Sequence, residues 1–295
     1  MESKSEILEK ARLWMYRNAR PITFARWKYH FEQGNSQEVV DILRTYQNDD
    51  GGFGYGLEAD SWNPNSSPIE TNRAVEILRE VGYEDKHSDL IQGILNYLES
   101  GKNFKNKRWQ ITVPENNNYP HAPWWTYHED TDGYSDYNPT ASLIEFILHF
   151  GDPESEFYLL ALNILEELKE DFIKNRNLTM HEVICLTSLV EYLDDEHLYK
   201  AIDSVIEKDH LKWGGYNARP STFLKSKMSP LYESYSKLVA EEIIYLLNTR
   251  NEDGVWEINW EWNAYMEQFA ISENWWKGEI TINNLIFLKN FDAIS

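Results

Sequence analysis

Apolar residues recur every three to four positions along most of this chain, which is the spacing of amphipathic α-helices. The first run covers residues 5–18, and its apolar residues are Ile7, Leu8, Ala11, Trp14 and Met15. Later runs cover about 21–33, 36–46, 68–81, 87–100, 138–150, 154–173, 178–193, 196–209, 229–249 and 276–291. Alternation with a period of two is essentially absent, so we expect no convincing strand and an all-α fold.

Several runs begin with residues that are typical of helix N-termini. Ser36 precedes the third run as a cap. In Ser67-Pro68-Ile69-Glu70 the serine can cap, the proline suits the first helical position, and Glu70 stands where a capping box has its acid. Asn138-Pro139 repeats the cap-plus-proline start, and Ser229-Pro230 opens the region to residue 249. The run after Asn138 is apolar on nearly every side, which predicts a helix that is buried all round.

A glycine-rich stretch, Tyr46-Gln47-Asn48-Asp49-Asp50-Gly51-Gly52-Phe53-Gly54-Tyr55-Gly56, separates two of the helical runs. Glycine permits a sharp turn at positive φ, and neighbouring carboxylates and amides can bond the backbone of that turn. The pattern returns near the C-terminus, where Asp253-Gly254-Val255-Trp256 aligns with Asp50-Gly51-Gly52-Phe53 and follows a similar helix. Two copies of helix, Asp-Gly and aromatic residue indicate an internal repeat.

These two copies resemble the squalene-cyclase-like repeat of the prenyltransferase and terpene-cyclase superfamily, whose members carry Gln-x-x-(Asp)-Gly-x-(Phe/Trp) at this place. Weaker matches stand at Phe104–Trp109 and Lys212–Tyr216. The resemblance implies an α/α toroid, a barrel of helical hairpins. In the family this motif is structural, so the resemblance is more specific for architecture than for activity.

The connections between the helical runs alternate between short and long. The long ones cover residues 48–66, 101–137, 210–228 and 250–275. If helix pairs pack side by side around a ring, these loops gather on one face, which we call the mouth. Ten of the twelve tryptophans lie in them or directly beside them: Trp62, Trp109, Trp124, Trp125, Trp213, Trp256, Trp260, Trp262, Trp275 and, at the border of the last loop, Trp276. Because no change in composition marks a linker, we expect a single toroid domain over residues 1–295 with an aromatic-rich and acidic mouth.

Composition and charge narrow the partners and the cellular location. The net charge of −21 over 295 residues argues against nucleic acids and anionic membrane surfaces, which bind basic faces. No apolar run approaches the ~20 residues of a membrane span. The single cysteine, Cys185, excludes an internal disulfide, and no N-terminal signal is evident. We therefore expect an acidic cytoplasmic protein. The aromatic-rich mouth is the place where we expect a small-molecule ligand.

The segment 121–133 concentrates aromatic and acidic residues just before the helix at residue 138. Class II terpene cyclases protonate an alkene with Asp-x-Asp-Asp, and Asp130-Thr131-Asp132-Gly133 is similar except that Gly133 replaces the last acid. Asp136 could stand in, so the resemblance suggests Asp130, Asp132 and Asp136 as catalytic candidates. Alternatively, these acids cap the following helix or bind loop backbone. The candidate ligand-binding residues are Asp60, Trp62, Trp109, His121, Trp124, Trp125, Tyr127, Trp256, Trp260 and Trp262.

Metal and diphosphate chemistry have weaker signals. Protein prenyltransferases hold zinc with Asp, Cys and His. Here His181 and Cys185 are four residues apart and could share a helix face, but the acid stands at the wrong distance from the cysteine. We therefore expect no zinc site and expect Cys185 to be a core residue. The Asp-Asp-x-x-Asp motif for Mg²⁺ and diphosphate is absent, so Mg²⁺ would come only with a bound diphosphate. Two basic clusters could receive one or could be solvated loop charges: Lys102, Lys105, Lys107 and Arg108, and Arg219, Lys225 and Lys227.

Three functions remain open at this point. The first is a toroid that binds or transforms an isoprenoid, as a transferase or cyclase if it is an enzyme. The second is a carbohydrate-active α/α-barrel enzyme, in which tryptophans stack on sugars and two of Asp60, Asp132, Glu257 and Glu261 act as acid and base. The third is a non-catalytic toroid that binds a ligand or a protein partner.

Overall fold

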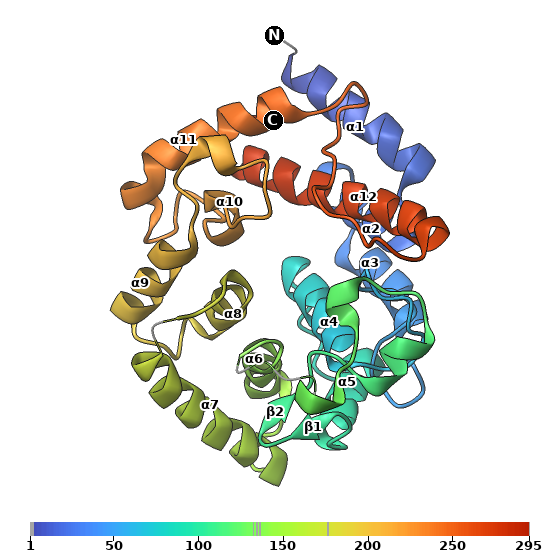
Figure 1. Ribbon diagram of the computed structural model, residues 1–295, viewed down its shortest axis with the longest axis vertical. Coiled ribbons are helices and arrows are strands. Elements are labelled where there is room, and N and C mark those ends of the chain that lie inside the picture. Colours follow the sequence, from blue (N-terminus) through green and yellow to red (C-terminus); the bar gives the residue numbers. More distant parts are fainter. Residues whose placement is uncertain (1–2, 132, 134, 136, 176, 295) are drawn as a thin grey trace. The chain divides into compact units, whose positions relative to one another are not determined.

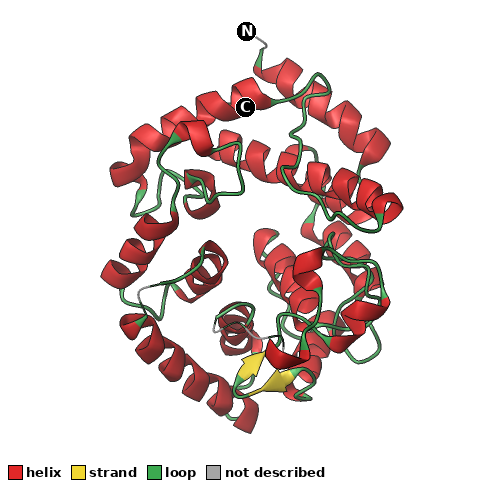
Figure 2. Ribbon diagram, viewed as in Figure 1, coloured by secondary structure: helices red, strands yellow, loops and turns green. Residues whose placement is uncertain are grey.

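A computed structural model describes residues 3–131, 133, 135, 137–175 and 177–294 (Figure 1). Helices make up 60% of the described residues, which contain twelve α-helices and one small two-stranded sheet (Figure 2). This confirms the all-α fold that the hydrophobic spacing predicts. The toroid arrangement stays a prediction.

The helices are α1 (Lys4–Asn18), α2 (Pro21–Phe31), α3 (Ser36–Leu43), α4 (Pro68–Glu80), α5 (Asp89–Glu99), α6 (Thr140–Phe150), α7 (Glu156–Lys174), α8 (Met180–Leu186), α9 (Asp195–Val205), α10 (Pro220–Phe223), α11 (Tyr232–Thr249) and α12 (Met266–Asn290). Strands β1 (Phe104–Lys105) and β2 (Arg108–Trp109) pair antiparallel. Short 3₁₀ turns occupy Arg44–Tyr46, Pro114–Asn118, Pro123–Trp125, Glu129–Thr131, Thr187–Leu189 and His210–Lys212.

The chain forms two compact units that alternate along the sequence. Unit 1 contains Met1–Val39, Ile202–Glu261 and Met266–Ser295, and unit 2 contains Val40–Ala201 and Trp262–Tyr265. The chain passes between the units within α3, within α9, and on either side of the four-residue segment from Trp262 to Tyr265. The single domain over residues 1–295 stays a prediction.

Unit 1 is built around α12, which packs against α1 and α2. Apolar residues such as Ala11, Ile22, Trp27 and Leu285 are almost completely buried there. A carboxylate is buried with them: Glu279 on α12 accepts hydrogen bonds from α2 and from the residue before it. Tertiary packing, rather than helix propensity alone, therefore stabilises these helices.

Unit 2 has α6 at its centre, in contact with α4, α7 and α8. Eight of the eleven α6 residues are buried; these are Thr140, Ala141, Ser142, Leu143, Ile144, Phe146, Ile147 and Leu148. This confirms the prediction that the helix after Asn138 is covered on nearly every side. On one border Glu145 still reaches solvent and pairs with Arg79 of α4.

At three helix N-termini the structure differs from the predicted capping. Asn35 caps α3, because its Oδ1 accepts the backbone N–H of Glu38 at 3.0 Å, and Ser36 is already helical. Ser67 caps α4 as predicted, whereas the Glu70 carboxylate accepts the backbone N–H of Glu58 at 2.7 Å instead of completing a capping box. No side chain caps α6, so the cap predicted at Asn138 is wrong.

Several elements also differ from the sequence prediction: α11 begins at Tyr232 and not at Ser229-Pro230, and α10 lies within the loop expected over residues 210–228. Helix α12 begins at Met266, about ten residues earlier than expected, so Trp275 and Trp276 lie on a helix and not in a loop. Burial of Phe269 and Ser272 extends the packed face of α12 toward its N-terminus. The strand pair was missed because two residues are too short for a period; its turn is made by Asn106 and Lys107, both at positive φ.

Candidate functional site

The glycine-rich stretch forms a tight turn in unit 2. The backbone N–H of Asn48 donates to the Gly52 carbonyl at 2.8 Å, and that of Gly51 donates to the Asn48 carbonyl at 2.9 Å. Gly51 has φ +86°, a left-handed conformation that glycine adopts without steric cost. The turn directs Phe53 into the core, where it is completely buried.

The second copy forms the same turn in unit 1. The backbone N–H of Asn251 donates to the Val255 carbonyl at 2.8 Å, and that of Gly254 donates to the Asn251 carbonyl at 3.0 Å. Gly254 has φ +82°, and Trp256 is buried in the place of Phe53. The two stretches aligned in the sequence therefore share their hydrogen-bond pattern and their buried aromatic residue.

The additional glycines of the first copy let another segment lie against its turn. A Cβ atom at Gly52 would lie 2.6 Å from the Cβ of Ser66, and one at Gly54 would lie 2.4 Å from the Pro64 carbonyl oxygen. Both distances are too short for any side chain, so residues 64–66 can approach only because these positions are glycine. In the second copy Val255 occupies the position of Gly52.

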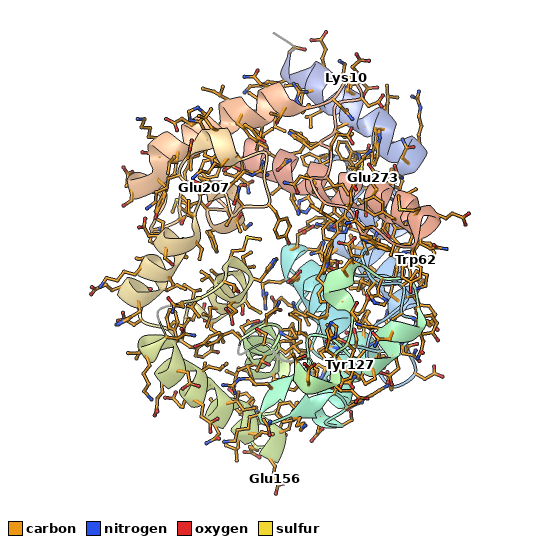
Figure 3. All side chains as sticks on the ribbon, in the orientation of Figure 1. Lys10, Trp62, Tyr127, Glu156, Glu207 and Glu273 are labelled. Atoms are coloured by element: carbon orange, nitrogen blue, oxygen red, sulfur yellow. The ribbon has the colours of Figure 1, made fainter. Side chains whose placement is uncertain are left out.

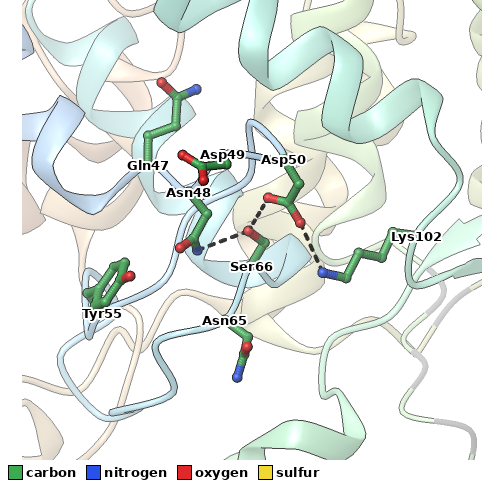
Figure 4. Close-up of a pocket in the computed structure, with 8 residues that line it drawn as sticks. All are labelled: Gln47, Asn48, Asp49, Asp50, Tyr55, Asn65, Ser66 and Lys102. Carbon is green, nitrogen blue, oxygen red and sulfur yellow. Dashed lines mark hydrogen bonds and ion pairs between the residues drawn. The ribbon is translucent and has the colours of Figure 1, made fainter.

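A cavity of about 320 Å³ opens beside the first turn (Figure 4). It lies wholly within unit 2 and is lined mainly by polar side chains. The lining residues are Gln47, Asn48, Asp49, Asp50, Tyr55, Asn65, Ser66 and Lys102. We call this cavity the turn pocket.

Asp50 is the central charge of the turn pocket. Its carboxylate accepts hydrogen bonds from the Ser66 hydroxyl, from the Gly52 backbone N–H at 3.1 Å and from Lys102 Nζ at 2.9 Å. Partial burial of Asp50 opposes its ionisation, but these hydrogen bonds and the Lys102 charge outweigh burial and hold its pKa below the ordinary value. Asp50 is therefore a carboxylate at neutral pH.

The two copies of the turn use the same asparagine differently. Asn251 Oδ1 accepts the backbone N–H groups of Asp253 and Val255, at 3.0 and 3.1 Å, so its amide closes its own turn. Asn48 instead donates through Nδ2 to the Pro64 carbonyl and to Ser66 Oγ, both at 3.0 Å. The pocket therefore lies where the asparagine of the first copy bonds a second segment and not its own turn.

Three of the predicted ligand-binding residues are buried in unit 2, where a backbone bridge between Ser61 and His121 joins their neighbouring segments. Trp262 Nε1 donates to Asp60 Oδ1 at 2.8 Å, and both side chains are almost fully buried. His121 Nδ1 donates to the Tyr119 carbonyl at 2.6 Å, while its Nε2 lies 3.1 Å from Thr126 Oγ1. These contacts hold the loops of unit 2 together, and Trp109 is likewise a core residue.

The remaining ligand-binding candidates are dispersed. Trp62, Trp125 and Tyr127 are half-buried on the loops of unit 2, where Figure 3 labels Trp62 and Tyr127, and Trp124 is exposed. Trp256 and Trp260 belong to unit 1, where Trp256 is buried and Trp260 packs edge-on against Trp276 with ring centroids 5.3 Å apart. Within unit 2, Asp60, Trp62 and His121 thus come from neighbouring loop segments, joined by the hydrogen bond from Trp62 N–H to the Pro120 carbonyl.

Of the catalytic candidates, only Asp130 can be placed. It lies exposed in the 3₁₀ turn Glu129–Thr131, while Asp132 and Asp136 fall outside the described residues. The carboxylates proposed for carbohydrate chemistry do not share one unit: Asp60 belongs to unit 2, and Glu257 and Glu261 belong to unit 1. Glu257 is paired with Lys277 at 2.7 Å.

Cys185 and the basic clusters have ordinary structural partners. Burial raises the pKa of the Cys185 thiol to about 12, and its Sγ donates to Asn138 Oδ1 at 3.8 Å. Lys107 pairs with Glu167, and Lys227 pairs with Asp292. Across the part of the chain that the structure describes, no group of three or more His, Cys, Asp or Glu side chains is arranged to hold a metal ion.

Comparison with known proteins found no matching family model, no similar curated protein and no similar solved structure. Among the helices of the described residues, none combines the length and apolarity needed to cross a membrane.

The sequence singles out the glycine-rich stretch but not the pocket beside it. It predicts a structural turn over residues 46–56 and a ligand among the tryptophans of the long loops. Ser66 and Lys102 lie outside the stretch, and only the fold brings them to Asp50. The available signal was the contrast between Gly52 and Val255, because a glycine in one copy and a valine in the other marks a place where a second segment can approach.

Proposed function

We propose that this protein binds a small hydrophilic ligand in the turn pocket, without transforming it. The observation that supports the proposal is a cavity of about 320 Å³ whose polar walls are fixed by hydrogen bonds at one copy of a turn and not at the other. Small-molecule pockets begin at about 300 Å³, so the turn pocket suits a compact ligand. Its polar lining favours a ligand that exchanges hydrogen bonds with water for hydrogen bonds with protein.

Binding without chemistry fits the groups that line the pocket. Asp50 is held ionised by its three donors, which suits an anchoring charge better than a proton carrier with a pKa near neutrality. The Ser66 hydroxyl donates to Asp50 and accepts from Asn48, so it is positioned by the network. Among the described residues that line the cavity there is no histidine to act as a base.

The test is a thermal-shift panel of small sugars, amines and carboxylic acids on the purified chain. A ligand that binds only the folded protein stabilises it by about 2.7 kcal/mol at a hundred times its dissociation constant. Asp50→Asn removes the central charge of the pocket, and Asp253→Asn makes the same change in the second turn. We expect a shift that Asp50→Asn diminishes and Asp253→Asn preserves; no shift with any hydrophilic ligand would refute the proposal.

An isoprenoid-binding α/α toroid is the second candidate. It is supported by Gln47-Asn48-Asp49-Asp50-Gly51-Gly52-Phe53, which matches the superfamily motif, and by the hydrogen-bond pattern that this turn shares with residues 251–255. Prenyl diphosphates with and without Mg²⁺ belong in the same panel, followed by product analysis with Asp132→Asn. A shift with prenyl diphosphates that Asp50→Asn leaves intact would favour this candidate over the turn pocket.

A carbohydrate-active α/α-barrel enzyme is the third candidate. Tryptophans and carboxylates on the loops, such as Trp62 and Glu261, support it. Release of reducing sugar from neutral and acidic oligosaccharides would establish this activity, and thermal shifts without any turnover would instead favour simple binding.

A further inference from the structure

We propose that the ligand of the turn pocket is a small organic cation, an amine that carries two or more ammonium or hydroxyl donors. This inference rests on the proposed function and adds the charge and the hydrogen-bonding class of the ligand. It follows from the way in which the amide and carboxyl groups of the pocket are oriented.

Two amides have their NH₂ groups committed to protein carbonyls. Gln47 Nε2 donates to the carbonyls of Gly51 and Leu90, at 3.0 and 3.1 Å, and Asn48 Nδ2 donates to the Pro64 carbonyl at 3.0 Å. A carbonyl can only accept, so it must face the NH₂ group and not the oxygen of the amide. The amide oxygens of Gln47 and Asn48 accept no hydrogen bond from any residue that the structure describes.

A chain of amides fixes Asn65 in the same sense. Asn65 Nδ2 donates to Asn63 Oδ1 at 2.9 Å, Asn63 Nδ2 donates to Asn116 Oδ1 at 2.9 Å, and Asn116 Nδ2 donates to the Trp125 carbonyl at 3.0 Å. Because the chain ends on a carbonyl, its direction cannot be reversed. The amide oxygen of Asn65 is thus also without a donor from the described residues.

The carboxylates add negative charge to these acceptors. Asp49 lines the pocket, is exposed, and forms no hydrogen bond or ion pair with any described residue. Asp50 is ionised at neutral pH for the reasons given above. The residues that line the pocket therefore carry three amide oxygens without a donor from the described residues and two carboxylates, which suits a ligand rich in N–H or O–H donors and disfavours an anion.

Lys102 shows how an ammonium group binds here. Its Nζ lies 2.9 Å from Asp50 Oδ2, and Figure 4 shows this contact beside the contact of Asp50 with Ser66. The Lys102 side chain is 44% exposed, and an ion pair this open is weak enough for the ammonium of a ligand to replace it. Lys102 is in this sense a tethered competitor for the site.

Tyr55 supplies an aromatic surface on the rim of the pocket. Its side chain is 55% exposed, and its φ of +60° is unusual for a bulky residue. The backbone N–H of Tyr55 donates to the Asn63 carbonyl at 2.9 Å and so helps to hold this conformation. An aromatic face attracts cations and covers alkyl groups, which matches an amine better than a bare metal ion.

Isothermal titration calorimetry on the whole chain tests this inference. The probes are 1,4-diaminobutane, spermidine and glucosamine, with glucose, inorganic phosphate and CaCl₂ as the other arms. We expect an amine to bind one-to-one, Asp50→Asn to weaken that binding at least tenfold, and Lys102→Gln to strengthen it several-fold. Asp253→Asn keeps the same net charge as Asp50→Asn and should bind as the wild type does, which controls for the general attraction of amines to an acidic protein.

Each other outcome is decisive. If glucose, phosphate or Ca²⁺ binds in an Asp50-dependent manner and no amine does, the pocket is a binding site but the assignment of an organic cation is overturned. If Lys102→Gln abolishes amine binding, Lys102 is part of the site and not a competitor, which also overturns it. If none of the probes binds while the variants retain the wild-type circular dichroism, the inference fails, and a negative thermal-shift panel would then reject the proposed function separately.

Discussion

Asp50 and Asp253 occupy the same position in two copies of one turn, yet their surroundings give them different roles. Asp50 accepts from Ser66, Gly52 and Lys102, and residues 64–66 supply one of these donors by crossing its turn. Asp253 follows an asparagine whose amide closes its own turn. The role of a carboxylate here is decided by the second segment that approaches it, which depends on the glycines nearby.

Gly51 should therefore be far less replaceable than Gly82. Both have positive φ, but a Cβ at Gly51 would lie 2.0 Å from the Gly93 carbonyl oxygen, whereas a Cβ at Gly82 meets nothing within 4 Å. We expect Gly82→Ala to cost about 1–2 kcal/mol of unfolding free energy for its backbone conformation alone. Gly51→Ala should cost a further 1–3 kcal/mol or so, because α5 must also shift. Urea unfolding measures both, and equal costs would contradict the crowding at Gly51.

Breaking the Arg219–Glu242 ion pair should lower the free energy of unfolding by an amount that depends on pH. The Glu242 side chain is completely buried, and this burial raises the pKa of its carboxyl group. Arg219, whose Nε lies 3.2 Å from Glu242 Oε1, and the hydrogen bonds from Ser221 lower that pKa but do not offset burial. A raised carboxyl pKa means that stability is present below the ordinary pKa and is lost as pH rises through the folded-state pKa. Arg219→Met removes the counter-charge and raises that pKa further.

We expect Arg219→Met to cost about 3 kcal/mol at pH 7.5, the lower end for breaking a buried pair. The cost should become smaller at pH 5, where Glu242 is more readily protonated. Denaturant unfolding at both pH values measures this, with Arg12→Met on the exposed face of α1 as the matched control. A cost that is the same at both pH values would mean that Glu242 does not change its protonation state between pH 5 and pH 7.5.

At the scale of elements, α2 and α12 are joined by a buried charge cluster. The Glu279 carboxylate on α12 accepts hydrogen bonds from Thr23 and Arg26 of α2 and from Arg20, which directly precedes α2. Arg26 is completely buried and Glu279 nearly so. Removing one charge from such a cluster leaves the others without compensation in a medium of low polarity.

Glu279→Gln is therefore expected to lower the unfolding free energy by about 3–5 kcal/mol. Glu273→Gln is the matched control on the same helix, since Glu273 is about one-third exposed and pairs with Lys277 at 3.0 Å. That change should cost less than about 1 kcal/mol, as for other surface pairs. Guanidinium unfolding compares the two variants, and a similar cost for both would show that the α2–α12 cluster is not a stabilising unit.

The helices were largely predictable because each carries a periodic apolar face. Runs such as 5–18, 68–81 and 154–173 needed only that face, and α1, α4 and α7 lie there. The N-terminal half of α12 was not predictable, because the tryptophans and acidic residues around Trp275 are also typical of an exposed loop. Only the packing in the structure, where Phe269 is buried, shows that this segment is helical. Asn35 was missed as a cap because Ser36, beside it, has an equally suitable side chain.

The candidate site was less predictable than the helices. The sequence located the turn at Gly51 and its second copy at Gly254, since Asp-Gly before an aromatic residue is a local signal. It did not bring Ser66 or Lys102 to Asp50, because such contacts depend on how loops cross. It also predicts that tryptophans contact a ligand; Trp109, Trp256 and Trp262 are buried, and their part in binding stays a prediction.

At the scale of the whole molecule, the net charge of −21 should oppose compaction. Added salt screens the repulsion between like charges, so we expect Tm to rise between low ionic strength and about 0.15 M NaCl, where the Debye length is near 8 Å. Differential scanning calorimetry at pH 7.5 measures the change. The rise should be smaller near pH 5, where fewer carboxyls are ionised; an equal rise at both pH values would point to specific ion binding instead.

The interleaving of the two units has a consequence for synthesis on the ribosome. Unit 2 is almost entirely encoded by the continuous stretch Val40–Ala201, whereas α1 and α2 belong to a unit that also needs Ile202–Glu261 and Met266–Ser295. At about 5–20 residues per second, the ribosome needs roughly ten to thirty seconds to translate the stretch between these parts. Helices α1 and α2 therefore wait for their partners while unit 2 is translated, and Trp27 on α2, which is buried in the folded unit, stays uncovered during that interval.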